Sequence, residues 1–144
     1  MFSKTCEYAL RAMLFVGQKS KKGERAGIKE IAFGIDSPEH FIAKILQELG
    51  KRKLLQSAKG PNGGFYVDKK GMQCSLYDIV KAIDGDRVFS GCGLGLKECS
   101  SKKPCPIHDE FKKIRKDIQD MLQAAKLGEF NEQLEQKLIF LKRA

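Results

Sequence analysis

The chain has 144 residues, a formal net charge of +9 and a sequence pI near 9.4. Its length allows about one domain with a modest core and an appended element, which excludes two large independent units. No stretch approaches the roughly 20 apolar residues that span a bilayer, and the apolar run 9–16 is interrupted by Arg11 and lacks a cleavage-like site after it. We therefore expect a cytoplasmic protein with no membrane partner.

The positive charge lies mainly in the N-terminal half. Residues 1–73 contain 14 Lys and Arg against 7 Asp and Glu, whereas residues 74–144 contain 13 against 11. Such an excess indicates either a solvated basic surface or a polyanion as partner.

The chain opens with a segment that predicts two helices. Ser3 can cap the first helix, because apolar residues follow it at helical spacing. Residues 19–27 are polar and contain glycines, which predicts a loop. Residues 28–33 form a second, short helical pattern that we expect to stop at Gly34.

A third helix is expected directly after this turn. Asp36 or Ser37 is the expected N-cap, and Pro38 suits the first turn because its missing N–H costs nothing there. The helix should end at Gly50. Its apolar residues form one stripe that we expect to be buried: Phe41, Ile42, Ile45, Leu46 and Leu49. Two helices joined by a short turn are typical of a helix-turn-helix.

A short hairpin follows. Residues 54–58 and 65–67 predict two strands around a turn-rich tip, 59–64, and a helix-turn-helix followed by such a hairpin is a winged helix. Ser75 and Asp78 then form a capping box that opens another helix.

The C-terminal segment predicts a dimerisation helix. Its apolar residues recur at alternating intervals of four and three, the a/d pattern of a coiled-coil seam: Ile107, Phe111, Ile114, Ile118, Met121 and Ala125. Such a helix needs a partner, which a homodimer supplies. A final amphipathic stretch, 131–143, should pack on the body.

The predicted fold is therefore mainly α-helical with a small β-hairpin. We expect a winged helix-turn-helix domain over 1–84, a cysteine-rich loop over 85–106, and a dimerisation helix with a C-terminal helix over 107–144.

The outward side of the third helix is the first candidate binding surface. In a helix-turn-helix the second helix enters the major groove of DNA. Its outward residues here are Glu39, His40, Ala43, Lys44 and Gln47. His40, Lys44 and Gln47 can hydrogen-bond bases or phosphates, although each is also ordinary helix surface. Lys51 and Arg52 after the helix form a basic turn that either meets phosphates or stays solvated.

The hairpin tip is the second candidate DNA contact. Its predicted contact residues are Lys59, Gly60, Pro61, Asn62 and Gly63. A tight turn needs one or two glycines, whereas three glycines beside a lysine favour close approach to a narrow groove. A plain structural turn is the alternative.

Cys92, Cys99, Cys105 and His108 form a candidate metal site with the spacing C-x6-C-x5-C-x2-H. Three thiolates and an imidazole could hold zinc or an iron–sulfur cluster. Structural zinc sites usually use C-x2-C knuckles, which are absent here, and a glycine-rich loop can wrap a larger inorganic core. The spacing therefore favours a cluster, and an inert loop is the alternative.

Three segments together resemble the IscR/NsrR-type iron–sulfur regulators: the opening SKTCEYALRAM at 3–13, the wing KGPNGGFY at 59–66, and the loop with Cys92, Cys99 and Cys105. The likeness covers nearly the whole chain. It implies a dimeric winged-helix repressor whose cluster state controls promoter binding. Because a two-fold dimer reads two half-sites, we expect a roughly palindromic operator in double-stranded DNA. The implied cluster would sense cluster supply, nitric oxide or redox state.

The same resemblance leaves two choices for the fourth ligand. His108 matches the IscR-type position and implies a 2Fe-2S cluster. Glu7 of the partner subunit falls where some relatives supply a carboxylate, which implies a 4Fe-4S cluster. We expect His108 and 2Fe-2S. Lys59 departs from the family pattern, in which the wing cation is usually arginine.

Two other functions stay open on the sequence. A cluster-free regulator of the same fold could respond to a metabolite, a partner protein or thiol oxidation. An enzyme or electron carrier could use the same cysteines, but the chain has no nucleotide loop, no nucleophile with a matched base and only 2 histidines. We expect a regulator, not an enzyme.

Overall fold

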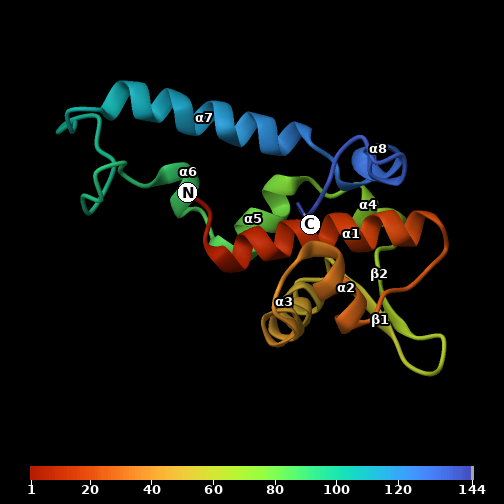
Figure 1. Ribbon diagram of the computed structural model, residues 1–144. Helices are drawn as coiled ribbons and strands as arrows, with labels where there is room; N and C mark the ends of the chain where they lie inside the picture. The colour runs from red at the N-terminus through yellow and green to blue at the C-terminus, as the bar shows by residue number, and fades with distance from the viewer. Residues whose placement is uncertain (144) are drawn as a thin grey trace.

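The computed structural model describes residues 1–143, and Ala144, the last residue of the predicted C-terminal segment, lies outside the described residues. The N-terminal half contains helices followed by a hairpin: α1 (Lys4–Lys21), α2 (Ile28–Ile35), α3 (Glu39–Lys51), β1 (Gln56–Ala58) and β2 (Gly64–Tyr66). The C-terminal half is helical: α4 (Lys69–Met72), α5 (Leu76–Asp84), α6 (Arg87–Ser90), α7 (His108–Ala124), the 3-10 helix η1 (Leu127–Phe130) and α8 (Asn131–Glu135). Helix α1 crosses the middle of the molecule, with α2, α3 and the hairpin on one side and α7 and α8 on the other (Figure 1). The fold is mainly α-helical with a small β-hairpin, as the sequence predicts.

Helix α1 is the central element of the core. Ser3 is its N-cap, because the Ser3 hydroxyl accepts a hydrogen bond from the Cys6 N–H at 3.0 Å. Its inward face is fully buried: Cys6, Ala9, Ala12, Met13 and Val16. The helix continues to Lys21, so the polar loop begins at Lys22 and not at the predicted residue 19. Basic side chains favour the negative end of the helix dipole, which explains the extension.

The turn between α2 and α3 differs from the prediction in two respects. Gly34 lies inside α2 and does not stop it. A Cβ there would come within 2.2 Å of the Phe15 ring, so the packing of α1 on α2 requires glycine at this position. The helix ends at Ile35, and Asp36 follows in the left-handed region at φ 55°. The N-cap of α3 is Pro38, without a side-chain hydrogen bond, so the expected cap at Asp36 or Ser37 is wrong.

Helix α3 buries most of its predicted stripe. Ile42, Ile45, Leu46 and Leu49 are at most 4% exposed. Phe41, however, is 49% exposed, so its predicted burial is wrong. Its ring lies at the edge of the helix, with the His40 ring centroid at 4.5 Å and the Tyr8 ring centroid at 6.2 Å. The helix passes through Gly50 and ends at Lys51.

The hairpin is a wing attached to the helical body. Its strands pair antiparallel in the register Gln56↔Tyr66, Ser57↔Phe65 and Ala58↔Gly64. The first strand begins two residues later than predicted, and the second begins one residue earlier. A third segment joins them through an isolated bridge, in which the Ala26 and Phe65 amides each donate to the carbonyl of the other residue, at 3.0 and 2.8 Å. This bridge fixes the hairpin beside α2, and the result is a winged helix.

The chain after the wing forms α5, crosses into the cysteine loop and returns along α7. The capping box of α5 is present, with Asp78 N–H donating to the Ser75 hydroxyl at 3.1 Å and Ser75 N–H to the Asp78 carboxylate at 2.9 Å. Beyond α7, Leu127 is fully buried against the core. The stretch 131–143 is helical only as far as Glu135, which shortens the predicted C-terminal helix. None of the helices in residues 1–143 has the length and apolar character of a membrane span.

Candidate DNA-binding surface and cysteine loop

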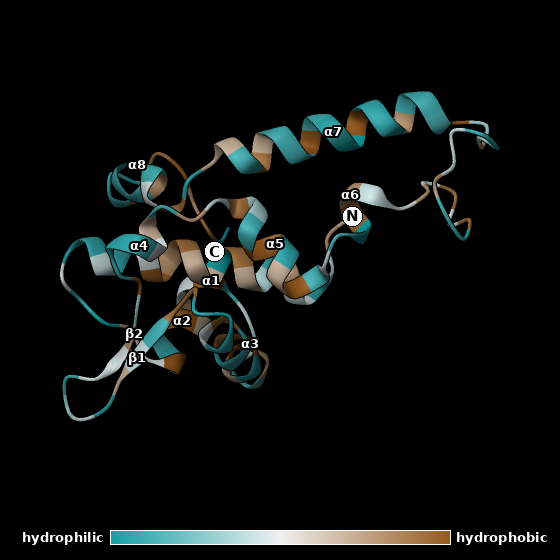
Figure 2. Cartoon of the chain, turned by 180° about the vertical axis from the view of Figure 1, so that it is seen from behind, coloured by the Kyte–Doolittle hydropathy of each residue, from teal (hydrophilic) through white to brown (hydrophobic). Residues whose placement is uncertain are grey.

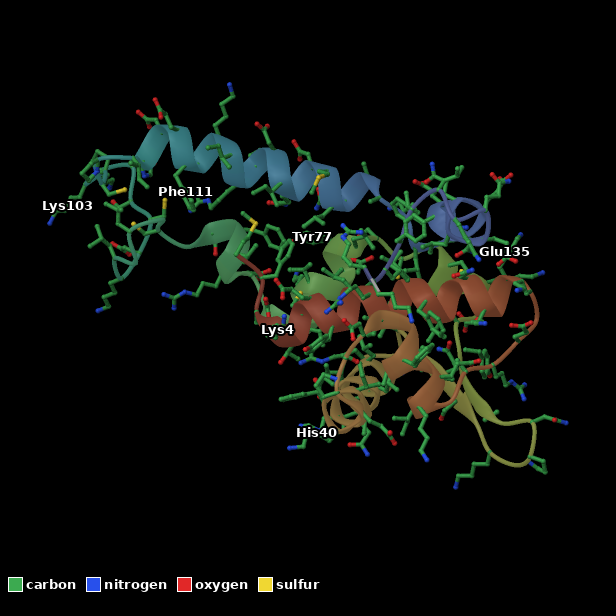
Figure 3. All side chains as sticks on the ribbon, in the orientation of Figure 1. Lys4, His40, Tyr77, Lys103, Phe111 and Glu135 are labelled. Atoms are coloured by element: carbon green, nitrogen blue, oxygen red, sulfur yellow. The ribbon has the colours of Figure 1, made fainter. Side chains whose placement is uncertain are left out.

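Helix α3 presents the predicted base-contact residues on its free side. Glu39, His40, Lys44 and Gln47 are exposed, and Ala43 between them is half-buried. Figure 3 shows His40 at the end of the molecule that lies far from Lys103 of the cysteine loop. The candidate DNA contacts and the candidate metal ligands are therefore well separated within one chain.

The basic turn after α3 is also exposed. Lys51 lies in the last turn of α3, and Arg52 is its C-cap. The Arg52 Nε donates to the Glu48 carboxylate at 3.1 Å, with both side chains exposed to solvent. Such a surface ion pair contributes little stability, so it does not prevent Arg52 from turning towards a phosphate.

The wing glycines are explained largely by the wing's own packing. A Cβ on Gly63 would lie 2.4 Å from the Ala58 carbonyl oxygen, and one on Gly64 would lie 2.9 Å from the Ala26 carbonyl oxygen. Gly60 has a φ of +99° and no atom within 4 Å of the added Cβ. The number of glycines therefore does not by itself indicate groove contact. The exposed tip residues, from Lys59 to Asn62, are what remains available to DNA.

Arg25 is a cation at the wing that the sequence did not single out. Its guanidinium donates to the Asn62 carbonyl oxygen at 3.3 Å and lies 5.1 Å from the centroid of the Tyr66 ring. It reaches the tip because the neighbouring residue, Ala26, pairs with the second strand. No local pattern reveals this bridge between distant segments, so the sequence offered no signal for Arg25.

Two of the four predicted metal ligands, Cys99 and His108, lie in direct contact. The Cys99 sulfur lies 3.4 Å from His108 Nδ1, and the Ser101 hydroxyl lies 3.5 Å from His108 Nε2. His108 is 7% exposed, the three cysteines are half-buried, and all of the thiols are free. Within residues 1–143 no three ligating side chains converge on one point.

Cys92 has the environment of a thiolate ligand. Backbone N–H groups of Leu94 and Leu96 hold the pKa of its thiol below the usual value, with further lowering from Cys105 and Gly95 and a smaller opposing effect of desolvation. Peptide N–H groups directed at sulfur are the donors that tune iron–sulfur ligands. The donor set of thiols and imidazole therefore fits an iron–sulfur cluster. Glu7, the alternative ligand offered to a partner subunit, is exposed on α1 and lies 3.6 Å from the Lys4 ammonium.

The predicted coiled-coil seam of α7 divides into two faces. Ile107, Ile114 and Met121, spaced seven residues apart, are 39%, 52% and 60% exposed. The other half of the seam turns inwards, and Ile118 packs beside the buried Val80 and Leu122. Figure 2 shows the apolar bands of α7 on an otherwise hydrophilic helix. We call Ile107, Ile114 and Met121 the outer stripe.

A helix-turn-helix whose second helix and wing are both exposed defines a DNA-binding transcription regulator of the winged-helix class. Residues 2–133 match the model of the Rrf2 family, described as an iron-dependent transcriptional regulator. The chain belongs to the Rrf2 family. It is a DNA-binding transcriptional regulator and not an enzyme.

Similar proteins support this family membership. The chain is 29% identical over 142 residues to a protein of Aquifex aeolicus (strain VF5) assigned as an HTH-type transcriptional regulator, covering 97% of this chain and 96% of the other. It is 30% identical to the HTH-type transcriptional regulator NsrR of Oceanobacillus iheyensis, covering 72% and 71%.

Solved structures share the fold. CymR, the global cysteine regulator of B. subtilis, superposes with a TM-score of 0.73 at 18% identity, covering 92% of this chain and 96% of that one. IscR of T. potens superposes with a TM-score of 0.73 at 18% identity, covering 96% and 91%. The predicted resemblance to IscR/NsrR-type regulators is confirmed at the level of the family.

Proposed function

We propose that this protein is a homodimeric repressor whose affinity for a roughly palindromic operator is controlled by an iron–sulfur cluster, 2Fe-2S in preference to 4Fe-4S. The ligands of the proposed cluster are Cys92, Cys99, Cys105 and His108. The observation that carries the proposal is the position of His108, which is both the neighbour of Cys99 and the first residue of α7. A group bound there acts directly on the helix that bears the outer stripe.

The dimer is supported by the outer stripe. Three large apolar side chains, each at least 39% exposed, follow one line along α7, between residues that are mainly charged or polar. Covering this line with the same helix of a second copy removes apolar area from water and repeats the knob positions of a coiled coil. A two-fold dimer presents two α3 helices and two wings, so its operator has two half-sites.

The DNA-binding role of specific residues is supported by exposure and charge. The α3 contacts are Glu39, His40, Ala43, Lys44 and Gln47, followed by Lys51 and Arg52. The wing contacts are Lys59, Gly60, Pro61, Asn62 and Gly63. Arg25 lies beside the same tip, so lysine and arginine cations lie near the expected phosphate path. The basic half of the chain thus coincides with the proposed DNA surface.

The cluster is supported by the chemistry of the loop. Three half-buried thiols, one buried imidazole and peptide N–H groups at Cys92 match the needs of a cluster with one histidine ligand. When bound, a cluster supplies iron that reacts with oxidants and nitric oxide. The four side chains must then converge on one group, because no three of them converge in the metal-free fold of residues 1–143. This movement at the start of α7 alters the spacing of the two DNA-binding units.

Anaerobic purification tests the cluster and its coupling together. We expect a coloured protein with matching amounts of iron and sulfide, and a 5- to 150-fold difference in operator affinity between the cluster-bound and metal-free forms at fixed salt, the range that a typical coupling of about 1 to 3 kcal/mol produces. A colourless protein without iron, or equal affinities of the two forms, would overturn the proposal.

Single substitutions identify the ligands. Cys92→Ala and His108→Ala should lose iron, whereas Cys74→Ala is the matched control, because Cys74 lies outside the loop and should leave the iron content unchanged. Glu7→Gln should also retain iron. Iron lost from Glu7→Gln and retained in His108→Ala would instead assign the fourth ligand to Glu7 of the partner subunit and favour 4Fe-4S.

A cluster-free regulator of the same fold is the second candidate. The three free thiols of the loop favour it, because thiols in one flexible loop can form a disulfide without any metal. It predicts a colourless protein whose operator binding changes on oxidation and recovers on reduction. Cys92→Ser should abolish that response.

A further inference from the structure

Arg115 carries a buried positive charge on the inward face of α7. The residue is 8% exposed, and its Nε has no hydrogen-bond partner. No ion pair within residues 1–143 involves Arg115. A buried guanidinium without a counter-charge is strongly unfavourable, so a negative group is expected to bind near it.

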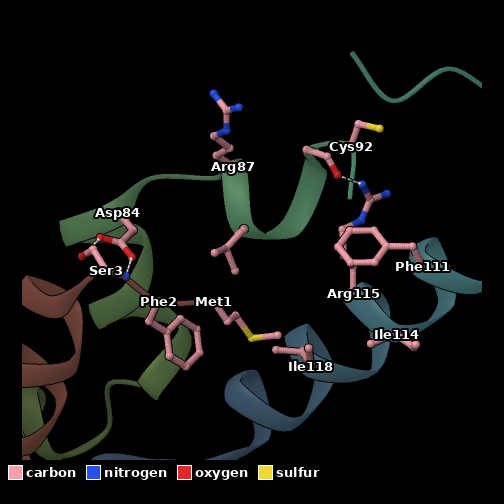
Figure 4. A pocket seen from close by; sticks show the side chains of 12 residues that line it. Met1, Phe2, Ser3, Asp84, Arg87, Cys92, Phe111, Ile114, Arg115 and Ile118 are labelled. Atoms are coloured by element: carbon pink, nitrogen blue, oxygen red, sulfur yellow. Dashed lines mark hydrogen bonds between the residues drawn. The ribbon is translucent and has the colours of Figure 1, made fainter. Parts of the chain in front are cut away.

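The contacts of Arg115 lead to the loop of Cys92. One guanidinium N–H donates to the carbonyl oxygen of Gly91, the residue directly before Cys92 (Figure 4). The guanidinium carbon lies 5.7 Å from the centroid of the Phe111 ring, one turn earlier on α7. Arginine suits this position because its planar group can donate to a carbonyl and face a ring at the same time.

The residue after Cys92 also rests on α7. A Cβ added to Gly93 would come within 2.9 Å of the Phe111 ring and 3.0 Å of the Ile107 side chain. The backbone at Gly93 is therefore in direct contact with the helix. Cys92 is held against α7 from both sides, by the Gly91 carbonyl at Arg115 and by Gly93 at Phe111.

Space for a negatively charged group adjoins these contacts. A cavity of about 570 Å³ lies between the N-terminus, α6 and α7, and Cys92, Arg115, Phe111 and Ile118 line it (Figure 4). Asp84 also lines the cavity, but its carboxylate accepts hydrogen bonds from the Ser3 N–H and hydroxyl. Arg115 is therefore the buried cation of this cavity, one residue away from Cys92 through the Gly91 carbonyl. Three thiolates around a 2Fe-2S core carry a net negative charge that such a cation can offset.

We infer that Arg115 is a positioning residue for Cys92, which anchors the loop to α7 through the Gly91 carbonyl and supplies the positive charge that the ligand site requires. This inference rests on the proposed function for the nature of the negative group. It identifies the physical link between the cysteine loop and the outer stripe, because Arg115 is adjacent in sequence to Ile114.

Iron retention is the first test. In anaerobically purified protein, Arg115→Met should lose iron to a chelator about 10- to 100-fold faster than the wild type, the range found when groups that support metal ligands are removed. Arg87→Met is the matched control, because Arg87 lines the same cavity but is exposed. The substitution removes the same charge from the same region. Equal rates for wild type and Arg115→Met would overturn the inference.

Hydrogen exchange of the metal-free protein is the second test. Arg115→Met should reduce the protection of the amides of residues 92–96, and Arg87→Met should not. Arg115→Lys keeps the charge but lacks the planar guanidinium with its several donors. It should therefore show intermediate protection and an intermediate rate of iron loss. If Arg115→Met does not fold, wild-type behaviour of Arg115→Lys in both measurements overturns the anchoring role.

The two tests separate this inference from the proposed function. A wild-type protein without iron overturns the proposed function, and the anchoring role of Arg115 then stands or falls on hydrogen exchange alone. A wild-type protein with iron and unchanged behaviour of Arg115→Met overturns the inference and leaves the proposed function intact.

Discussion

The winged-helix body and the cysteine loop with α7 differ in how much of their apolar and polar surface is covered by contacts within a single chain. In the body, Met13, Ile31 and Ile42 are fully buried, and the wing pairs with the segment at Ala26. In the loop, none of residues 91–107 is buried, and the outer stripe of α7 remains exposed. The body is therefore specified by its own contacts, whereas the loop and α7 keep surfaces that a second copy and a bound group can complete.

The largest expected effect comes from a charge on the outer stripe. Ile114→Glu places a carboxylate in the centre of the proposed dimer interface, so the protein should sediment as a folded monomer. Its affinity for DNA with two half-sites should fall by about 10²- to 10⁴-fold, because the avidity of linked binding is lost. Gln123→Glu adds the same charge on another face of α7 and should change neither property. A dimeric Ile114→Glu protein contradicts the interface.

A substitution in the wing probes the completeness of the body. Gly64→Ala should lower the free energy of unfolding by about 2 to 4 kcal/mol, because Gly64 has a φ of +138° and its added Cβ meets the Ala26 backbone. Gly60→Ala is the matched control, with a positive φ but open space, and should cost about 1 kcal/mol. Urea unfolding measures both values. Equal losses would show that the bridge to Ala26 contributes nothing.

The parts of the body that the sequence predicts are those fixed by local chemistry. The Ser3 cap and the Ser75 and Asp78 capping box follow from residues three positions apart, and both are present. The local pattern predicts a helix stop at Gly34, whereas the actual role of this glycine is to make room for Phe15, nineteen positions earlier in the chain. Phe41 fits the helical stripe by spacing, yet it lies at the edge of the core, which spacing alone does not reveal.

The candidate site follows the same division. The spacing of the cysteines and His108 indicates four candidate ligands, but which of them are in contact depends on how the loop rests on α7. Arg115 and Arg25 act through carbonyl oxygens of residues far away in sequence, so no motif contains them. The glycines at 63 and 64 indicate a tightly packed turn, in which an added Cβ would meet backbone atoms. They are not by themselves a sign of DNA contact.

The pKa of a thiol is raised in the body and lowered in the loop, and the pH dependence of stability tests this difference. Burial raises the pKa of Cys74 to about 11, with a further increase from Asp78 and an opposing effect of Lys126, whereas the pKa of Cys92 in the loop is lowered. Above pH 9 the unfolded chain loses the Cys74 proton while the folded chain keeps it, so stability falls as pH rises from 9 towards 11. Between pH 8 and 10.5 the wild type should lose about 1 kcal/mol more unfolding free energy than Cys74→Ala, because the thiol is only partly removed from solvent. The same loss in both proteins would contradict a half-buried thiol that stays protonated in the folded chain.

The smallest expected effect concerns one cation at the wing tip, where the body meets DNA. Lys59→Ala should weaken operator binding roughly three- to fivefold at moderate salt and weaken binding to unrelated DNA by a similar factor, because a lysine on phosphate carries no sequence information. The slope of log affinity against log salt should become shallower by about 1, since one fewer counterion is released. Lys69→Ala, an exposed lysine at the start of α4, is the matched control and should keep the wild-type slope. An unchanged slope for Lys59→Ala would place the wing tip away from the phosphates, and DNA contact would then rest on α3 and its basic C-terminal turn.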